Sequence, residues 1–254
     1  MSKHLHLICF FVTASLLLSC ESTTYETTEI EGKNIAIGNQ PILDESIEEF
    51  IAPYRQQIDK EMNKVLAFAP NSMFKTDSRL NTAIGNMMAD AVMDIGKPLV
   101  AKTEGEEIDV VLLNFGGIRA GINQGNITTR TAYEIMPFDN QLVVVKLAYP
   151  EMQALVDYLV ERKLAHPFSG MKLVLDKDGE FHSLEIVGQS LDEEKTYLVA
   201  TSDYLLTGGD QMSFFENNQG VIETNYKLRN LFIDYFEKID TIQSKQDDRF
   251  IQLK

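Results

Sequence analysis

Residues 108–119 read IDVVLLNFGGIR, and this stretch decides which kind of fold the chain adopts. Ile108 to Leu113 is almost entirely apolar and rich in β-branched residues, which is typical of a buried strand. Asn114, the pair Gly116-Gly117 and Arg119 follow directly. Paired glycines let a backbone turn tightly or approach a ligand, and an arginine can fork onto a phosphate or carboxylate. Taken by itself, the segment also fits an ordinary strand-to-loop turn with a surface arginine.

Outward from this strand, the pattern alternates between helices and strands. Apolar residues at spacings of three and four predict helices over 41–67, 81–94, 128–135, 150–163 and 226–238. Apolar or alternating runs predict strands over 34–38, 108–113, 141–147, 171–175, 181–187 and 196–201, and the C-terminal RFIQLK predicts an edge strand. This mixture predicts an α+β fold in one domain over residues 33–254.

Two further loops carry candidate binding residues. Met136-Pro137-Phe138-Asp139-Asn140 holds a phenylalanine beside a rigid proline, which suits a stacking platform for a base as well as a core position. In the segment 203–210, DYLLTGGD, Tyr204 precedes Gly208, Gly209 and Asp210. A carboxylate such as that of Asp210 can accept both hydrogen bonds of a ribose diol, but a tight turn with a solvated aspartate is the plainer interpretation.

The N-terminal residues have the pattern of a targeting signal. Lys3 precedes an apolar run of 12 residues, 7–18, which is too short to span a bilayer comfortably. The run ends in Leu-Leu-Ser-Cys at Cys20, and this resembles a bacterial lipoprotein signal. We expect residues 1–19 to be a signal peptide, Cys20 to be lipidated, and residues 20–32 to include a flexible, Thr-rich tether. An ordinary secretory signal containing a cysteine is the alternative.

Composition excludes several classes of function. The formal net charge of −15 disfavours contact with nucleic-acid backbones or anionic headgroups. Two cysteines and four histidines are too few for a disulfide framework or a Cys-rich zinc site, and they also argue against a histidine-rich two-metal centre. Beyond the predicted signal peptide, only His166 and His182 remain, and we expect both to be surface residues.

Together the three loops carry a family resemblance. The blocks NFGGIR, GNIT, PFDN and YLLTGGD occur in the order found in the C-terminal domain of the 5′-nucleotidase family, and IGNMMADA at 84–91 resembles its L-G-N-L-x-A-D-A helix. The resemblance covers about residues 40–254. It implies a C-terminal substrate-specificity domain with a mixed sheet flanked by helices. Residues 33–70 would correspond to the helical segment that links the two domains in full-length members.

The resemblance implies roles for individual residues. Asn114 and Arg119 would contact base and phosphate, Phe138 and Tyr204 would sandwich the base, and Asp210 would hold the ribose hydroxyls. The backbone of the binding loops would be shaped by four glycines, Gly116, Gly117, Gly208 and Gly209. Phe115 replaces a glycine common in the family. The family's other phosphate-binding arginines have no clear match, since Arg79, Asn86 and Lys97 are only nearby. The resemblance therefore implies base and ribose recognition more firmly than phosphate binding.

Beyond the predicted signal peptide, the sequence lacks the metal-binding blocks of the family's N-terminal metallophosphoesterase domain, D-x-H, G-N-H-[DE] and H-x-H. We therefore expect no catalytic residue, metal site or cofactor in this chain. The resemblance implies the substrate-binding half of an exported, membrane-anchored 5′-nucleotidase, with two divalent metals in a separately encoded metallophosphoesterase partner. The alternatives are a non-catalytic nucleoside- or nucleotide-binding lipoprotein and a structural relic.

Overall fold

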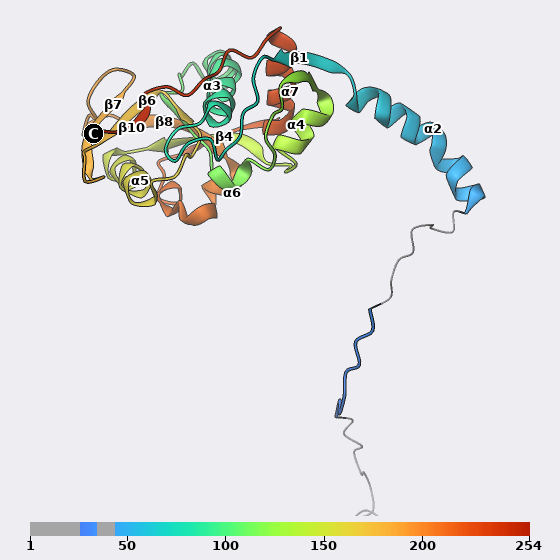
Figure 1. Cartoon of the computed structure of the whole chain (residues 1–254). Coiled ribbons are helices and arrows are strands. Elements are labelled where there is room, and N and C mark those ends of the chain that lie inside the picture. The colour runs from blue at the N-terminus through green and yellow to red at the C-terminus, as the bar shows by residue number, and fades with distance from the viewer. Residues whose placement is uncertain (1–25, 35–43) are drawn as a thin grey trace, which may run out of the picture. The chain divides into compact units, whose positions relative to one another are not determined.

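The computed structural model describes residues 26–34 and 44–254 (Figure 1). Cys20, the signal peptide and most of the strand expected at 34–38 lie outside the described residues. The chain divides into two units, Met1–Glu49 and Phe50–Lys254. In the first, residues 26–34 form neither helix nor strand. Helix α2 (Glu45–Met62) begins in the first unit and ends in the second, and Asp44 Oδ1 accepts the Ser46 N–H at its start.

A five-stranded mixed sheet forms the centre of the larger unit. Its order is β5-β2-β8-β4-β9, built from β5 (Phe168–Ser169), β2 (Val110–Leu112), β8 (Tyr197–Ser202), β4 (Gln141–Leu147) and β9 (Val221–Lys227). β2 runs parallel to β8, whereas β4 is antiparallel to both β8 and β9. The predicted strand at 108–113 is therefore confirmed, and it lies inside the sheet.

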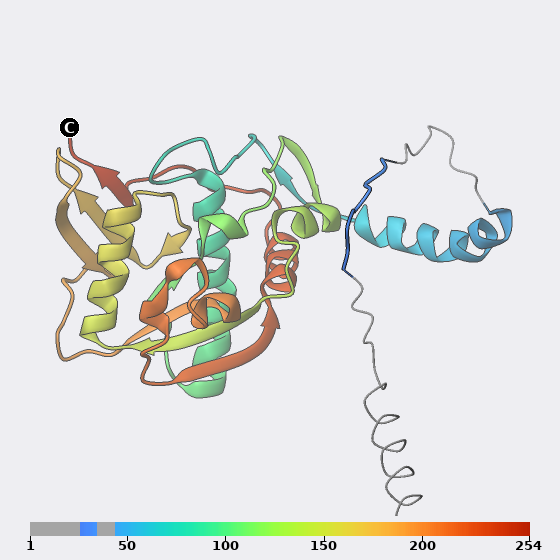
Figure 2. The same cartoon turned by 90° about the horizontal axis from the view of Figure 1, so that it is seen from below.

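Successive residues of the central strands face two different hydrophobic cores. Val111 and Val144 pack into a core formed with α3 (Ala83–Glu104) and α7 (Leu228–Lys238). Val110 and Val145 pack on the opposite face, into a core with α5 (Tyr149–Arg162). A strand buried on both faces needs apolar residues at every position, which explains the apolar run from Val110 to Leu113. Figures 1 and 2 show α3 and α5 as separate layers.

A smaller sheet completes the second core. It has the order β10-β6-β7, formed by β10 (Phe250–Gln252), β6 (Met171–Leu175) and β7 (Phe181–Ile186). β10 lies at its edge and pairs parallel to β6, so the predicted C-terminal edge strand is confirmed. The mixed sheets flanked by helices make the fold α+β, as expected. Among the described residues, no helix is both long and apolar enough to cross a membrane.

Several elements differ from the expectation. The helix expected over 41–67 ends at Met62, and Val65–Ala69 is strand β1, which pairs antiparallel with β3 (Gly125–Thr128). Hydrogen bonds from the partner strand β3 make this segment extended. The helical spacing of Val65 therefore gave the wrong prediction. Residues 221–227, ahead of the last helix, form the edge strand β9. Helix α3 runs on to Glu104 through Pro98, and Gly105 (φ 70°) ends it as a left-handed cap.

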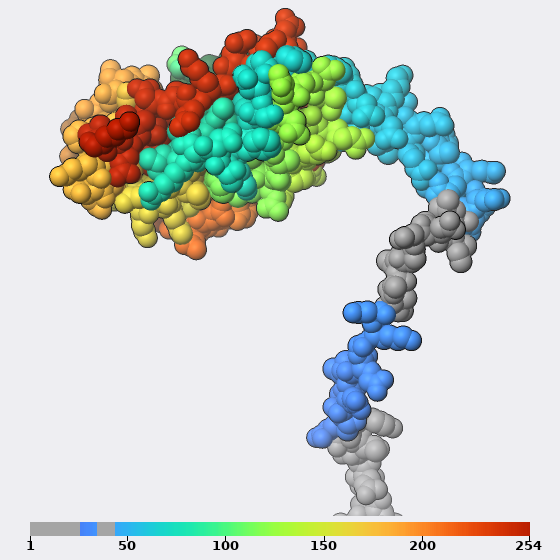
Figure 3. Space-filling model, in the orientation of Figure 1, coloured from blue at the N-terminus to red at the C-terminus, as the bar shows by residue number. Residues whose placement is uncertain are grey.

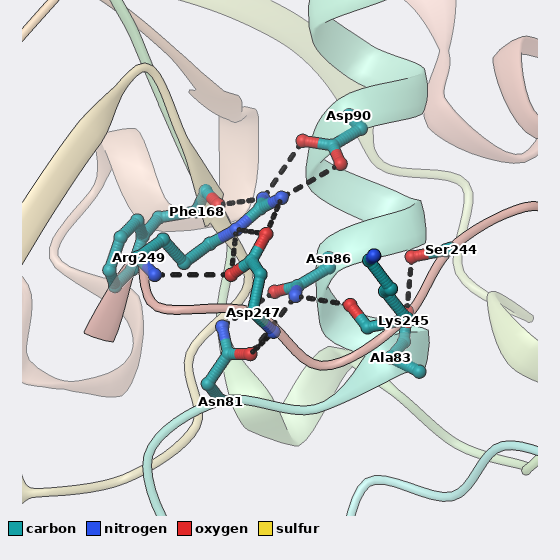
Figure 4. A network of polar contacts seen from close by, with 9 residues as sticks. All are labelled: Asn81, Ala83, Asn86, Asp90, Phe168, Ser244, Lys245, Asp247 and Arg249. Carbon is teal, nitrogen blue, oxygen red and sulfur yellow. Dashed lines mark hydrogen bonds and ion pairs between the residues drawn. The ribbon is translucent and has the colours of Figure 1, made fainter. Parts of the chain in front are cut away.

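The C-terminal segment is anchored across the start of α3. In Figure 3 the red C-terminal segment lies along the teal segment that leads into α3. Figure 4 shows the contacts: Arg249 forms a bidentate ion pair with Asp90 (2.8 and 2.9 Å) and binds Asp247. Asn81 and Asn86 exchange two hydrogen bonds (2.8 and 3.0 Å), and Asn86 also donates to the Lys245 carbonyl. Asn86 and Asp90, which belong to the block IGNMMADA, thus hold the C-terminal segment in this chain.

Candidate functional site

The strand directions bring the three candidate loops to one edge of the central sheet. β2 and β8 are parallel, so the loops that follow Leu112 and Ser202 leave from the same edge. β4 is antiparallel to β8, so the loop that precedes Gln141 reaches that edge as well. Ligands in open α/β sheets bind at carboxyl ends of strands for the same geometric reason. Residues almost a hundred positions apart therefore meet in one place.

One pocket of about 270 Å³ lies where the loops meet. Its walls come from the loop after β2, the loop between α4 (Thr129–Ile135) and β4, and the segment after β8. The lining residues are Asn114, Gly116, Gly117, Arg119, Phe138, Asn140, Tyr204 and Asp210. Seven of the nine substrate-binding residues predicted from the sequence are thus brought together. Asn140 is an eighth lining residue, which the sequence indicated only as part of the PFDN block.

Asp210 is the polar centre of this pocket. Asn114 Nδ2 donates to Asp210 Oδ2 at 2.6 Å, and the Tyr204 hydroxyl donates to Oδ1 at 3.4 Å. The Asp210 backbone is left-handed (φ 52°), a conformation that costs free energy for a residue with a side chain. The Tyr158 hydroxyl holds this turn by donating to the Asp210 carbonyl at 3.0 Å. A strained backbone that presents a carboxylate bound by two neighbouring side chains is typical of a preorganised binding site.

Gly208 and Gly209 do not line the pocket but build the turn that presents Asp210. This turn joins α6 (Asp203–Leu206) to the short 3-10 helix η2 (Gly209–Gln211). A Cβ at position 209 would lie 2.5 Å from the Tyr204 carbonyl oxygen and 2.6 Å from its ring. A Cβ at Gly117 would likewise lie 2.7 Å from Asn114 Oδ1. Only glycine lets these loops approach the polar side chains so closely.

Two aromatic rings and one cation complete the walls. Phe138 is 40% exposed and Tyr204 is 45% exposed, although both are large aromatic residues on ordered loops. The Arg119 guanidinium carbon lies 5.6 Å from the Phe138 ring centre. A planar ligand could stack on these half-exposed rings. The carboxylate would offer it hydrogen-bond acceptors, and the guanidinium would offer it a positive charge. This combination fits a nucleoside or a nucleotide.

His166 is not a surface residue, contrary to the expectation. It is only 5% exposed, and its Nδ1 accepts the Phe115 N–H at 3.2 Å from the pocket loop. Burial lowers the His166 pKa to about 4, so the ring is neutral at pH 7. Its ring also packs 5.4 Å from that of Tyr158, which holds Asp210. His166 thus supports two pocket loops from behind, whereas His182 is exposed as predicted.

The histidine just before Pro167 gave a weak signal of this role. Its neighbours Ala165 and Phe168 are apolar, and such a setting is commoner for a buried histidine than for a surface one. Its contact with Phe115 spans 51 residues, however, and no local pattern reveals that distance in sequence. A second supporting residue, Arg229, was missed for the same reason, because its contacts with the Phe138 loop span about 90 residues.

The residues considered as extra phosphate ligands lie elsewhere. Asn86 is buried in the C-terminal anchor, Lys97 pairs with Glu107 at 2.9 Å, and Arg79 is not part of the pocket lining. Arg119 is the only cation among the pocket's lining residues. Within residues 26–34 and 44–254, no three His, Cys, Asp or Glu side chains are grouped so that they could hold a metal ion. The described residues do not fit a metal centre.

Comparison with known proteins agrees with this arrangement. A family model described as "5′-nucleotidase, C-terminal domain" matches residues 64–217. Protein UshA of Escherichia coli is 29% identical over 146 residues, which are 55% of this chain and 26% of UshA. A 5′-nucleotidase of Vibrio vulnificus is 23% identical over 83% of this chain and 38% of its own length.

Solved structures give the same result. The 5′-nucleotidase precursor from Thermus thermophilus superposes with a TM-score of 0.66 and 26% identity, over 83% of this chain and 43% of that one. The chain thus spans between a quarter and about two-fifths of the length of these relatives. Because the family model matches more than half of the chain, this protein belongs to the family of 5′-nucleotidase C-terminal domains.

Proposed function

We propose that this chain is the substrate-binding half of an exported 5′-nucleotidase and that its pocket binds the base and ribose of a nucleoside 5′-phosphate. The observation that carries the proposal is the convergence of Phe138, Tyr204 and Asp210 on one pocket. In this arrangement the rings stack on the base and the Asp210 carboxylate accepts hydrogen bonds from the ribose hydroxyls. The volume of about 270 Å³ lies near the lower limit of small-molecule sites, which favours a nucleoside-sized group over a larger cofactor.

Catalysis is assigned to a separate metallophosphoesterase chain that holds two divalent metals. The absence of a metal-binding cluster among the described residues supports this assignment. So does helix α2, where Ile47, Phe50, Tyr54 and Ile58 are 55–70% exposed. Their spacing of three and four residues puts them on one face of the helix. An apolar face of this kind is a suitable docking surface for a partner chain.

A second function is favoured by the shortage of cations. With Arg119 as the only cation lining the pocket, the site is better equipped for base and ribose than for a phosphate. This observation favours a nucleoside-binding lipoprotein without hydrolysis of its own. In both cases the chain is anchored through Cys20, which lies outside the described residues, and makes no contact with nucleic acid.

Thermal unfolding of the purified chain with adenosine, AMP or ribose tests the pocket. A ligand at 100 times its Kd adds about 2.7 kcal/mol to the free energy of unfolding and raises Tm by about 5–10 °C for a chain of this size. Adenosine and AMP should both produce this shift. Similar shifts for the two would favour the nucleoside-binding protein, whereas a larger shift with AMP would favour the nucleotidase half.

Asp210→Asn is the decisive variant because asparagine also tolerates the left-handed backbone. It should raise the adenosine Kd at least about tenfold, since a hydrogen bond to a charged acceptor is worth about 1.5–3 kcal/mol. Asp178→Asn, on the exposed turn between β6 and β7, is the matched control and should leave the Kd unchanged. If neither ligand shifts Tm in the wild type, the proposed pocket function is wrong.

A further inference from the structure

Arg229 lies under the loop that carries Phe138. It is in the first turn of α7 and is only 8% exposed. Its Nη1 donates to the carbonyl oxygens of Pro137 (3.0 Å) and Phe138 (3.2 Å), and its Nη2 binds Asp139 Oδ1 at 2.5 Å. One guanidinium therefore contacts three consecutive residues of the loop. The planar guanidinium presents its donors in a rigid fork that suits these contacts, whereas the compact ammonium of a lysine lacks this fork.

The other face of the guanidinium is held by α4. Its carbon lies 4.2 Å from the centre of the Tyr133 ring, a cation–π distance. Beside it, the Leu228 N–H donates to the Asn140 carbonyl at 3.0 Å. The start of α7 thus fixes the backbone on both sides of Phe138, and it also holds Asn140, another pocket residue.

The Phe138 ring depends on this support because a large part of it faces solvent. A ring that is 40% exposed is held less tightly by packing than a core ring, so the backbone of its loop contributes to its orientation. Arg229 also has a cost: its buried Nε has no hydrogen-bond partner among the described residues. A position selected only for stability would avoid such a buried donor, and departures of this kind gather at functional sites.

We propose that Arg229 is a positioning residue for ligand stacking, which acts by holding the Phe138 ring in its binding orientation before the ligand arrives. The inference rests on the proposed function of the pocket. Preorganising the ring removes the entropic cost of ordering the loop on binding. Arg229 itself does not line the pocket, so its effect on affinity must pass through the loop residues 137–140.

The sequence offers a direct probe, because it contains no tryptophan. Phe138→Trp places the chain's single tryptophan at the platform itself. Without ligand, its anisotropy should fall when Arg229→Lys or Arg229→Met is added, since the ring then moves more freely. Lys227→Ala is the matched control: Lys227 pairs with the same Asp139 (3.0 Å) but has no bond to the loop carbonyls, so anisotropy should not change.

A double-mutant cycle in binding separates positioning from a general loss of structure. In the native background, Arg229→Lys should raise the adenosine Kd at least about fivefold, within the range expected for losing hydrogen bonds from a charged donor. In a Phe138→Ala background the same change should alter the Kd by less than about twofold, because the ring through which it acts is gone. Additive effects in the two backgrounds would overturn the inference.

The outcomes distinguish this inference from the proposed function. Nucleoside binding that is unchanged by Arg229→Lys, or an unchanged anisotropy of the Phe138→Trp fluorophore, contradicts the positioning role while leaving the pocket function intact. Absence of nucleoside binding in the wild type contradicts the pocket function, whatever the anisotropy shows. If Arg229→Met fails to fold, Arg229→Lys, which keeps the charge and most of the volume, still decides the result.

Discussion

At the scale of single residues, the pocket depends on side chains that do not line it. His166 accepts the Phe115 N–H, Tyr158 donates to the Asp210 carbonyl, and Arg229 binds the loop of Phe138. His166 and Arg229 are buried and Tyr158 is partly buried, and each of the three holds a loop through its backbone. Binding loops on a rigid scaffold need such support, because a misplacement of about 1 Å already weakens a site. Because His166 is buried in this role, its pKa is lowered.

The buried neutral state of His166 predicts an acid-sensitive fold. Burial lowers its pKa from 6.5 to about 4, and the Asp210 carboxylate opposes this shift only partly. Between these two values the unfolded chain binds a proton that the folded chain does not, so stability falls as the pH falls through this window. The full contribution is present above about pH 6.5, and the loss approaches about 3 kcal/mol near pH 4.

Urea unfolding at intervals from about pH 7 to about pH 4 measures this slope. His166→Asn keeps an acceptor for the Phe115 N–H but does not titrate, so its stability should depend less steeply on pH in this window. His182→Asn, the same change at the exposed histidine on β7, should leave the slope of the wild type unchanged. Equal slopes for the wild type and His166→Asn would contradict a buried neutral histidine.

At the scale of elements, Arg249 provides the charged contact that holds the C-terminal segment to α3. Arg249 pairs with Asp90 and Asp247 and donates to the Phe168 carbonyl at 2.8 Å, while its side chain is only 16% exposed. Arg249→Met should lower the free energy of unfolding by about 2 kcal/mol, less than for a fully buried pair because Asp90 is partly exposed. Chemical denaturation with a fixed m-value measures the loss.

An exposed ion pair in the same region gives the matched control. Lys172 binds Asp248 at 2.5 Å, but both side chains face solvent, so Lys172→Met should cost no more than about 1 kcal/mol. Adenosine affinity should be unchanged in both variants, since the anchor lies outside the pocket lining. A similar small loss for both variants would show that the Arg249 network does not hold the C-terminal segment.

The helices and strands also show which parts of the fold could be predicted from the sequence. The run 108–113 and the strand 141–147 were predictable because both faces of each strand are buried, which leaves an unmistakable apolar pattern. β1 was missed because its conformation is decided by β3, about sixty residues away. The pocket loops were found through their glycines and aromatic residues, but His166 and Arg229 were not, since their contacts are with distant backbone groups.

At the scale of the whole molecule, the chain offers a pocket and an apolar helix face but no metal-binding cluster in its described part. We therefore expect the purified chain to release no phosphate from AMP with any divalent metal added. Release should begin when a candidate metallophosphoesterase chain is mixed with it. Robust turnover by this chain alone, free of contaminating phosphatase, would contradict the division of labour between two chains.

Variants of α2 then test whether its apolar face is where such a partner docks. Replacing Phe50 and Tyr54 by serine should lower phosphate release by the mixture and leave adenosine binding unchanged, because neither residue lines the pocket. Gln56→Ser, elsewhere on the same exposed helix, should leave both measurements unchanged. Activity of the mixture that survives the double change would place the docking surface outside α2. Lost adenosine binding would instead show that the helix supports the pocket, since a pure docking surface contributes to association and not to the affinity of a distant site.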